Sequence, residues 1–202
     1  ITDAGTPAIS DPGEVLVQKC LEQGIPITSL PGACACITGL TLSGLSTRRF
    51  CFEGFLPSDK KEKREILEEL SGESRTIVLY EAPHRLVRTL TELKETLGNR
   101  RITLCRELTK KFETILPTTL EDALTLYESE TPRGEYVLIL EGRSLADKKK
   151  AAMEDWQQLT IGEHMKFLEE QGITGKEAMK LAASQRGISR RDVYQYLLNE
   201  KQ

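Results

Sequence analysis

Between residues 25 and 141 the chain alternates short apolar runs with longer amphipathic ones. Short apolar runs are typical of buried strands, whereas apolar residues spaced three or four apart are typical of helices. The strand-like runs are 25–30, 76–80, 102–105, 112–116 and 136–141. The helix-like runs are 32–42, 60–70, 84–97 and 120–127. This alternation predicts an α/β fold in which helices cover a sheet.

The first thirteen residues are of a different kind, with small residues and turn formers around two acids. Gly5, Pro7, Pro12 and Gly13 fix a backbone that a ligand can approach closely, because few side chains stand in the way. A helical pattern follows directly from residue 14. The chain starts inside this motif and without a methionine, so we expect that a preceding segment is missing and that the first part of the sheet is incomplete.

The composition changes after residue 142. Residues 146–154 carry three consecutive lysines and predict a solvated linker or a frayed helix. Three short helices are predicted beyond it, at 161–171, 176–186 and 190–199. Capping boxes are predicted at Thr174 with Glu177, and at Ser189 with Asp192.

Composition narrows the class of protein. A chain of 202 residues with 39% hydrophobic residues can bury a core, and no apolar run is long enough to cross a bilayer. The net charge of −3 excludes a uniformly basic nucleic-acid binder but not a local basic patch. The five cysteines are an odd number, which favours reduced thiols in a cytoplasmic protein. Cys34 and Cys36 make a poor metal site because the two histidines are distant, so no metal is expected.

Several well-known signatures are absent, among them the dinucleotide-binding glycine motif, the Walker loop, the zinc-protease helix and the serine nucleophile elbow. Six other segments stand in a definite order. They are TDAGTPAISDPG at 2–13, LPGACA at 30–35, RFCFEGFLP at 49–57, YEAPHR at 80–85, RELTK at 106–110 and GEYV at 134–137. Together they resemble the ribosomal RNA small subunit methyltransferase I branch of the tetrapyrrole methylase superfamily.

This resemblance implies an enzyme that uses S-adenosylmethionine to methylate the ribose 2′-oxygen of a cytidine in the decoding region of 16S rRNA. It implies a tetrapyrrole-methylase-like fold of two α/β subdomains with the methyl donor between them, followed by a small helical domain. The expected layout is a partial first subdomain at 1–46, a second subdomain at 47–143, a linker at 144–159 and a helix-turn-helix-like domain at 160–202. The expected partner is the small ribosomal subunit, with no membrane involved, and a homodimer is expected in the cytoplasm.

The resemblance also assigns positions to the methyl donor. These are Ala4, Gly5, Thr6, Ile9, Cys34, Ala35, Tyr80, Glu81, Glu135 and Val137. Cys34 stands where relatives carry serine or threonine, and a thiol is a weaker hydrogen-bonding group than a hydroxyl. A donor contact at Cys34 is therefore expected through the backbone.

Charged residues near the predicted edge of the sheet are assigned to RNA. We expect Arg106 and Lys110 to bind phosphates, and to serve RNA rather than the fold. Glu107 and Glu113 are candidates for orienting the ribose hydroxyl, although no sequence feature identifies the base that takes its proton. Further RNA contacts are expected from the helical tail, at Lys180, Arg190 and Arg191.

Three alternatives stand beside this interpretation. The chain could methylate a tetrapyrrole precursor, although its RELTK segment and basic tail argue against that substrate. It could instead be a non-catalytic RNA-binding module. The tail's charges could also form an ordinary solvated face of a three-helix bundle.

Overall fold

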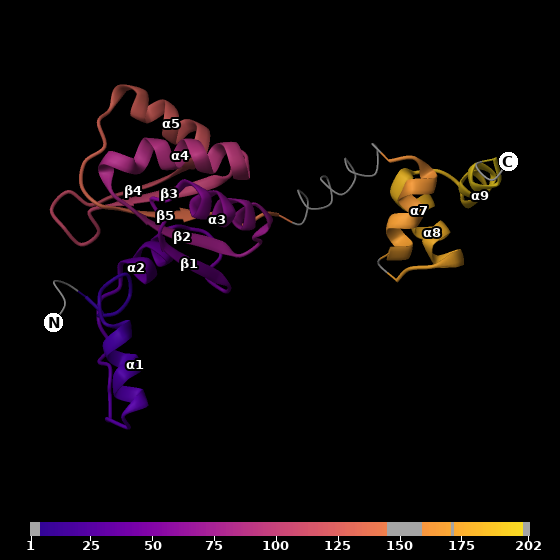
Figure 1. Cartoon of the computed structure of the whole chain (residues 1–202). Helices are drawn as coiled ribbons and strands as arrows, with labels where there is room; N and C mark the ends of the chain where they lie inside the picture. The colour runs from indigo at the N-terminus through magenta and orange to yellow at the C-terminus, as the bar shows by residue number, and fades with distance from the viewer. Residues whose placement is uncertain (1–4, 145–158, 171, 200–202) are drawn as a thin grey trace. The chain divides into compact units, whose positions relative to one another are not determined.

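A computed structural model describes residues 5–144, 159–170 and 172–199. Its contacts divide the chain into two compact units, Ile1–Arg143 and Ser144–Gln202, which we call the sheet unit and the helical unit. The sheet unit holds one five-stranded sheet and five helices among its described residues (Figure 1). The helical unit contains three helices in its described part.

The elements of the sheet unit follow the predicted alternation in most places. In chain order they are α1 (Glu14–Glu22), α2 (Ala35–Leu42), β1 (Phe50–Phe55), α3 (Lys60–Gly72), β2 (Thr76–Glu81), α4 (Pro83–Leu97), β3 (Arg101–Arg106), β4 (Thr114–Thr119), α5 (Leu120–Ser129) and β5 (Tyr136–Leu140). The helical unit adds α7 (Ile161–Glu170), α8 (Gly175–Arg186) and α9 (Arg190–Asn199).

The strand order in the sheet is β1-β2-β5-β3-β4. β1 and β2 run parallel, and every other neighbouring pair is antiparallel. β1, β2 and β3 therefore end at the same edge of the sheet at which β4 and β5 begin. We call this edge the motif edge, because four of the six segments identified in the sequence contain a strand end that lies at it.

Helices cover both faces of the sheet because its central strands are apolar on both sides. In β2, Ile77 and Leu79 point to the face covered by α3, α4 and α5, and Val78 points to the opposite face. The helices contribute leucines at helical spacing, such as Leu86, Leu90, Leu93 and Leu97 of α4. The larger of the two cores in the sheet unit lies on this side.

The opposite face is covered by α2, a helix of mostly small residues. A Cβ atom at Gly39 would lie 3.0 Å from Val137 Cγ1 and 3.1 Å from Ile139 Cδ1, so a larger residue would push these side chains away from α2. The end of the helix is fixed by the Thr103 hydroxyl, which donates to the Ser43 carbonyl at 2.9 Å. Small residues in α2 therefore serve close packing on the sheet.

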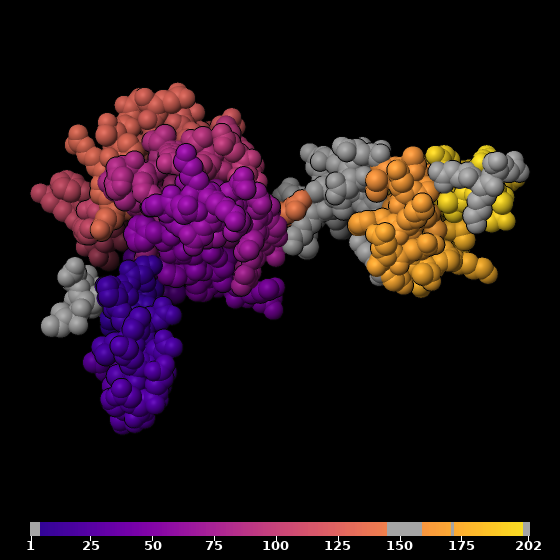
Figure 2. Space-filling model, in the orientation of Figure 1, coloured from indigo at the N-terminus to yellow at the C-terminus, as the bar shows by residue number. Residues whose placement is uncertain are grey.

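The predicted strand at 25–30 is wrong, because these residues form no strand in the structure. A strand needs a neighbour to satisfy its backbone groups, and none of the described strands pairs with this segment. The preceding helix α1 has no buried residue, although Val15, Leu16 and Leu21 are apolar. Figure 2 shows α1, in indigo, projecting from the body of the sheet unit. This part of the chain leaves its apolar side chains uncovered.

Helix ends follow local chemistry in several places. The Asp59 carboxylate accepts hydrogen bonds from the Lys61 and Glu62 N–H groups, which confirms the predicted start of α3. Gly98, with φ of 78°, closes α4, whose last residue Leu97 is the predicted one. β4 begins two residues later than the predicted strand at 112–116, because Phe112 belongs to the preceding loop. Pro117 is tolerated because β4 is an edge strand.

The three predicted helices of the tail are confirmed to within one residue at each described end, while Gln171 and the linker residues 145–158 lie outside the described residues. Ser189 and Asp192 form the predicted capping box, each side chain accepting from the other residue's N–H. The box predicted at Thr174 is wrong, since its side chain makes no capping hydrogen bond. Thr160 and Glu163 form an unpredicted box at the start of α7.

Candidate functional site

Tyr80, near the end of β2, joins three of the sequence motifs at the motif edge. Its hydroxyl oxygen accepts the N–H of Cys36 in the first turn of α2, at 2.9 Å. Its ring packs edge-on against Phe52 and Phe55 of β1, with centroids 4.9 and 5.6 Å apart. Burial raises the pKa of Tyr80 to about 12, so the hydroxyl is neutral. The predicted donor position Tyr80 thus fixes where α2 begins.

Glu81 ends β2 and is only 1% exposed. Its carboxylate accepts from the Ala82 N–H at 2.8 Å and from the Thr89 hydroxyl at 2.5 Å. Arg85 lies 3.3 Å away and also donates to the Leu56 carbonyl at 2.6 Å. The YEAPHR motif therefore ties β2 to α4 and to the end of the GFLP segment. Glu81 is a buried anchor of the edge, and its carboxylate is satisfied by the chain's own groups.

The loop at 5–13 lies against two other motif segments. Thr6 donates its N–H to the Ala33 carbonyl at 2.8 Å, and its hydroxyl reaches the same oxygen at 3.3 Å. Gly5 has φ of 73°, and a Cβ there would lie 2.5 Å from the Ala33 oxygen. A Cβ at Gly54 of β1 would meet the Ser10 hydroxyl at 2.9 Å. Glycine at position 5 allows two backbone segments to meet, and glycine at position 54 leaves room for the Ser10 side chain.

The loop at 107–113, between β3 and β4, is held by contacts among Glu107, Lys110 and Glu135, which we call the Glu107 latch. The Glu107 carboxylate accepts the Glu135 N–H at 2.9 Å, and the Glu107 N–H donates to the Glu135 carbonyl at 2.9 Å. The Lys110 ammonium lies 3.0 Å from Glu107 and 2.8 Å from Glu135. Glu113 accepts the Thr109 N–H at 2.6 Å. The RELTK motif thus folds its own loop onto the GEYV motif.

The latch also shifts the pKa values of Glu107 and Lys110. The hydrogen bond from the Glu135 N–H, together with Lys110, lowers the pKa of Glu107. The two carboxylates raise the pKa of Lys110, Glu135 contributing most. A carboxylate with a lowered pKa is a weaker general base at neutral pH. Lys110 was expected to serve RNA and not the fold. Its ammonium bridges two residues of the latch, and its role toward RNA stays a prediction.

The structure brings most of the predicted donor positions to the motif edge, but with unequal access. Gly5, Ile9 and Ala35 are exposed, whereas Thr6, Cys34 and Tyr80 are half-buried. Val137 is 6% exposed and packs under α2, and Ala4 lies outside the described residues. Glu135 is exposed and ion-paired to Lys110. A bound molecule could therefore contact the exposed and half-buried positions. At Glu81 and Val137 burial hinders such contact.

Several residues important to this edge were missed by sequence reasoning. Thr89 lies eight residues beyond Glu81 and reaches it only because α4 folds back over β2. Phe52 and Phe55 lie in β1, which was not predicted as a strand. Arg85 lies four residues after Glu81, and this spacing could have indicated that the two side chains form an ion pair.

The predicted basic positions of the helical unit, Lys180, Arg190 and Arg191, are all exposed. Arg186 is not available in the same way. Its guanidinium donates to His164 Nδ1 at 2.9 Å and to the Leu159 and Thr160 carbonyls. Arg186 is therefore engaged in contacts within the bundle, whereas Lys180, Arg190 and Arg191 are exposed on α8 and α9.

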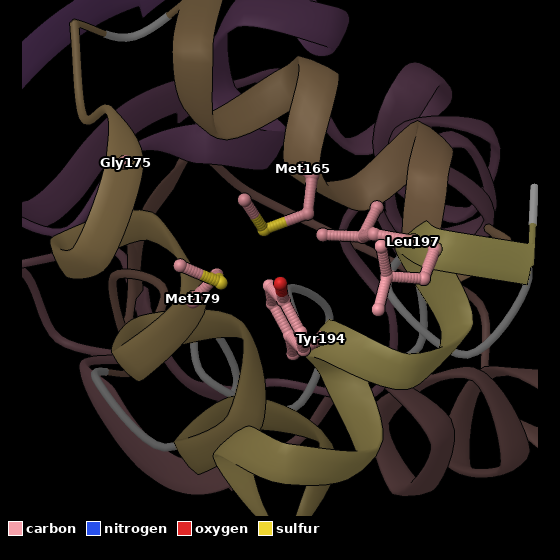
Figure 3. A pocket seen from close by; sticks show the side chains of 6 residues that line it. Met165, Gly175, Met179, Tyr194 and Leu197 are labelled. Carbon is pink, nitrogen blue, oxygen red and sulfur yellow. The ribbon is translucent and has the colours of Figure 1, made fainter. Parts of the chain in front are cut away.

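The same unit carries a shallow apolar groove between its helices (Figure 3). Figure 3 shows the side chains of Met165, Met179, Tyr194 and Leu197 gathered around it, with Gly175 at one end. Leu198 completes the lining.

In the described part of the chain, no three His, Cys, Asp or Glu side chains are grouped to hold a metal ion. Among the described helices, none is long and apolar enough to cross a membrane.

Comparison with known proteins places the chain among methyltransferases. The family described as Tetrapyrrole (Corrin/Porphyrin) Methylases matches residues 1–124. Proteins called "Ribosomal RNA small subunit methyltransferase I" are 43% identical in Halalkalibacterium halodurans, over 96% of this chain and 66% of that protein, and 41% identical in Synechocystis, over 98% and 70%. The Escherichia coli O157:H7 protein of that name is 39% identical, over 100% of this chain and 68% of its own length. The chain thus spans about two thirds of the length of these relatives.

Among solved structures, the methyltransferase CobJ has a TM-score of 0.50 and 22% sequence identity, over 70% of this chain and 64% of its own. At that identity the likeness concerns the fold alone, and it agrees with the predicted tetrapyrrole-methylase-like architecture.

Proposed function

The chain belongs to the tetrapyrrole methylases, and within them to the ribosomal RNA small subunit methyltransferase I family, and from this premise we propose that it methylates 16S rRNA with S-adenosylmethionine as methyl donor. The acceptor we propose is the ribose 2′-oxygen of a cytidine in the decoding region. The observation that carries the proposal is the identity of 41–43% to relatives of that name over nearly the whole chain.

The motif edge has the kinds of chemical group that a binding site for the methyl donor needs. Exposed small residues at Gly5 and Ala35 offer backbone groups that a ligand could reach, and the half-buried Thr6 and Tyr80 supply hydroxyls beside them. We assign the donor to these positions together with Ile9 and Cys34. Glu81 and Val137 would support them from beneath, because both side chains are buried in contacts of their own. Ala4 and Glu135 remain predicted donor positions.

When bound, the donor would supply an electrophilic methyl group on a sulfonium. The chain's part is then to place a ribose hydroxyl in line with that group, since positioning can supply a large share of such an acceleration. The 2′-oxygen forms the new C–O bond, the sulfur keeps the electrons of the broken C–S bond, and the hydroxyl proton leaves to a base. Glu107 is a weak candidate for that base because its pKa is lowered. Glu113 stays a candidate, although the Thr109 N–H already binds its carboxylate.

For RNA we propose two surfaces. Arg106, at the end of β3, lies at the motif edge, and Lys110 beside it is already paired within the latch. The exposed cations Lys180, Arg190 and Arg191 form the second surface, on the helical unit. Cations that bind phosphates release counterions and add affinity for any RNA sequence. The helical unit would then hold the small ribosomal subunit while the sheet unit carries the chemistry, in the cytoplasm and as a homodimer.

A tetrapyrrole precursor is the second candidate substrate, favoured by the family description and by the fold likeness. The two are separated by offering the protein a labelled donor with 30S particles, with naked 16S rRNA and with uroporphyrinogen. We expect label in the RNA of the 30S sample. Label in the macrocycle alone would favour the second candidate.

The donor assignment has its own test in Gly5→Ala. A Cβ at Gly5 would collide with the Ala33 carbonyl and separate the two loops. Gly24→Ala is the matched control, because Gly24 has a similar φ of 66° and nothing lies within 4 Å of its Cβ position. Calorimetry with S-adenosylhomocysteine on the intact natural protein should show weaker binding for Gly5→Ala only. Equal binding by both variants and the parent would place the donor elsewhere.

A further inference from the structure

Phe112 is the most exposed aromatic side chain among the described residues, at 65%. It lies in the loop between β3 and β4, which leaves the sheet at the motif edge (Figure 1). The ammonium of Lys111 lies 5.5 Å from its ring centroid, a cation–π distance. The ring belongs to neither core of the sheet unit.

The loop that carries Phe112 is rigidly built. Glu107 and Thr109 have φ of 51° and 64°, a left-handed conformation that non-glycine residues adopt only when their surroundings impose it. The Glu107 latch and the Glu113 carboxylate impose it here. Arg106 also donates to the Phe112 carbonyl at 3.4 Å. The charged residues of the loop are thus engaged in its shape, and Phe112 with Lys111 is what the loop presents outward.

The surroundings of Phe112 favour a nucleic-acid base over a protein surface. A stable protein interface buries about 800 Å² on each partner, with an apolar centre. Phe112 is instead flanked by exposed polar residues, namely Thr109, Lys110, Lys111, Glu113 and Thr114. A single aromatic ring among polar groups matches the platforms on which unpaired bases stack, with nearby cations meeting the phosphates.

We propose that Phe112 stacks on an unpaired base of the RNA substrate and that Lys111 binds the neighbouring phosphate. This proposal rests on the proposed function, because it names the nucleotide-binding element of the same edge. It predicts a preference for single-stranded RNA near the acceptor nucleotide. The latch holds the ring in place before RNA arrives, so little ordering is needed on binding.

Direct binding tests this proposal without the methyl donor. Affinities of the intact natural protein for a fluorescently labelled single-stranded 12-nucleotide RNA should fall at least about fivefold for Phe112→Ala, since a stacked base contributes about 1–3 kcal/mol. Phe112→Tyr should stay within about twofold of the parent, because it keeps the ring. Phe112→Leu keeps apolar volume but not the ring, so it should behave like alanine. Lys111→Gln should weaken binding and reduce its salt dependence.

Val87→Ala is the matched control, because Val87 is an exposed apolar residue, at 40%, on α4. It should leave RNA affinity unchanged. All these variants should have the same melting temperature as the parent protein. Full binding by Phe112→Leu would overturn stacking, as would no binding of the 12-nucleotide RNA by the parent. Unchanged RNA affinity in Phe112→Ala with weaker binding to 30S particles would indicate a ribosomal protein as the partner and also overturn it.

The outcomes also separate this proposal from the proposed function. Methylation of 30S particles at the parent's kcat and KM by Phe112→Ala would overturn the stacking proposal and leave the function intact. If the parent protein methylates no RNA but Phe112→Ala still binds RNA more weakly than the parent, the proposed function is overturned and the stacking proposal stands.

Discussion

The Tyr80 hydroxyl accepts the backbone N–H of Cys36 at 2.9 Å, and this one bond connects the end of β2 to the first turn of α2. The N–H groups of a first helical turn have no partner within the helix, so a side chain that satisfies one of them fixes where the helix starts. Of the proposed donor positions, Cys34 is the N-cap of α2 and Ala35 is its first residue. The placement of the proposed donor loop thus depends on a residue of the second strand.

Tyr80→Phe removes this bond and keeps the ring. We expect the free energy of unfolding to fall by about 1 kcal/mol, because the Cys36 N–H loses its partner in a half-buried place. S-adenosylhomocysteine affinity should fall as well, since the start of α2 loosens. Urea titration and calorimetry measure the two effects. Tyr196→Phe, at an exposed position of α9, should change neither, and equal effects of the two variants would contradict the account.

Gly134→Ala tests the Glu107 latch. Gly134 has φ of 76°, and an added Cβ would lie 2.5 Å from Glu107 Cγ. Gly98→Ala is a close control, with φ of 78° and nothing within 4 Å. Both variants should lose about 1 kcal/mol from left-handed strain, and Gly134→Ala should lose more because Glu107 must leave its partners. Hydrogen exchange of the Glu135 amide, which the latch protects, should speed up in Gly134→Ala alone.

The basic surface of the helical unit is tested by the salt dependence of RNA binding. Replacing Lys180, Arg190 and Arg191 with glutamine should reduce the slope of log affinity against log salt by about two to three, if each cation meets a phosphate. A matched triple replacement on α3, at Lys60, Lys61 and Arg64, removes three exposed charges from another surface. It should leave the slope nearly unchanged. The same slope in both triple variants would indicate a diffuse effect of net charge.

His164 predicts how the helical unit responds to acid. Burial, and then the charge of Arg186, lower its pKa to about 4, against about 6.5 in an unfolded chain. Between these values the unfolded state binds a proton that the folded state does not, so this contribution to stability falls as the pH drops from 6.5 to 4. Glu163 and Asp192, whose pKa values are lowered, lose stabilisation only at lower pH.

NMR can read this directly, because His84 is the only other histidine. In a His84→Gln variant, the single remaining ring should keep its neutral chemical shifts down to about pH 5. Ring resonances that titrate near pH 6.5 while the fold is intact would show that His164 is not buried as described.

The alternation of apolar and amphipathic runs was enough to predict four of the five strands and the helices around them. Strands covered on both faces appear in the sequence as short continuous apolar runs, and the helices that cover them keep apolar residues at helical spacing. β1 was missed because Glu53 and Gly54 interrupt its apolar run. Its pairing with β2 shifts register at the same place, between Phe52 and Gly54. The strand at 25–30 was predicted from local pattern alone, and pattern cannot supply the neighbour that a strand needs.

For the site, motif order indicated which segments meet, but not what each residue does there. Glu81 was assigned to the donor from its place at a strand end, yet it is buried under Thr89 and Arg85. Lys110 was assigned to RNA from its charge, yet it closes the latch. The contact of Lys110 with Glu135 joins residues 25 apart, which spacing within one motif does not encode. The contacts of Glu81 depend on how α4 folds back over β2, which the motif alone does not show.

The central claim is that this protein methylates the ribose of a small-subunit rRNA nucleotide. Its most direct test incubates the intact natural protein with S-adenosylmethionine and 30S particles that lack the modification, digests the 16S rRNA to nucleosides and identifies them by mass spectrometry. We predict 2′-O-methylcytidine that depends on donor and protein, located in a fragment from the decoding region. A methyl group on a base, or none in the rRNA while a tetrapyrrole precursor is methylated, would contradict the account.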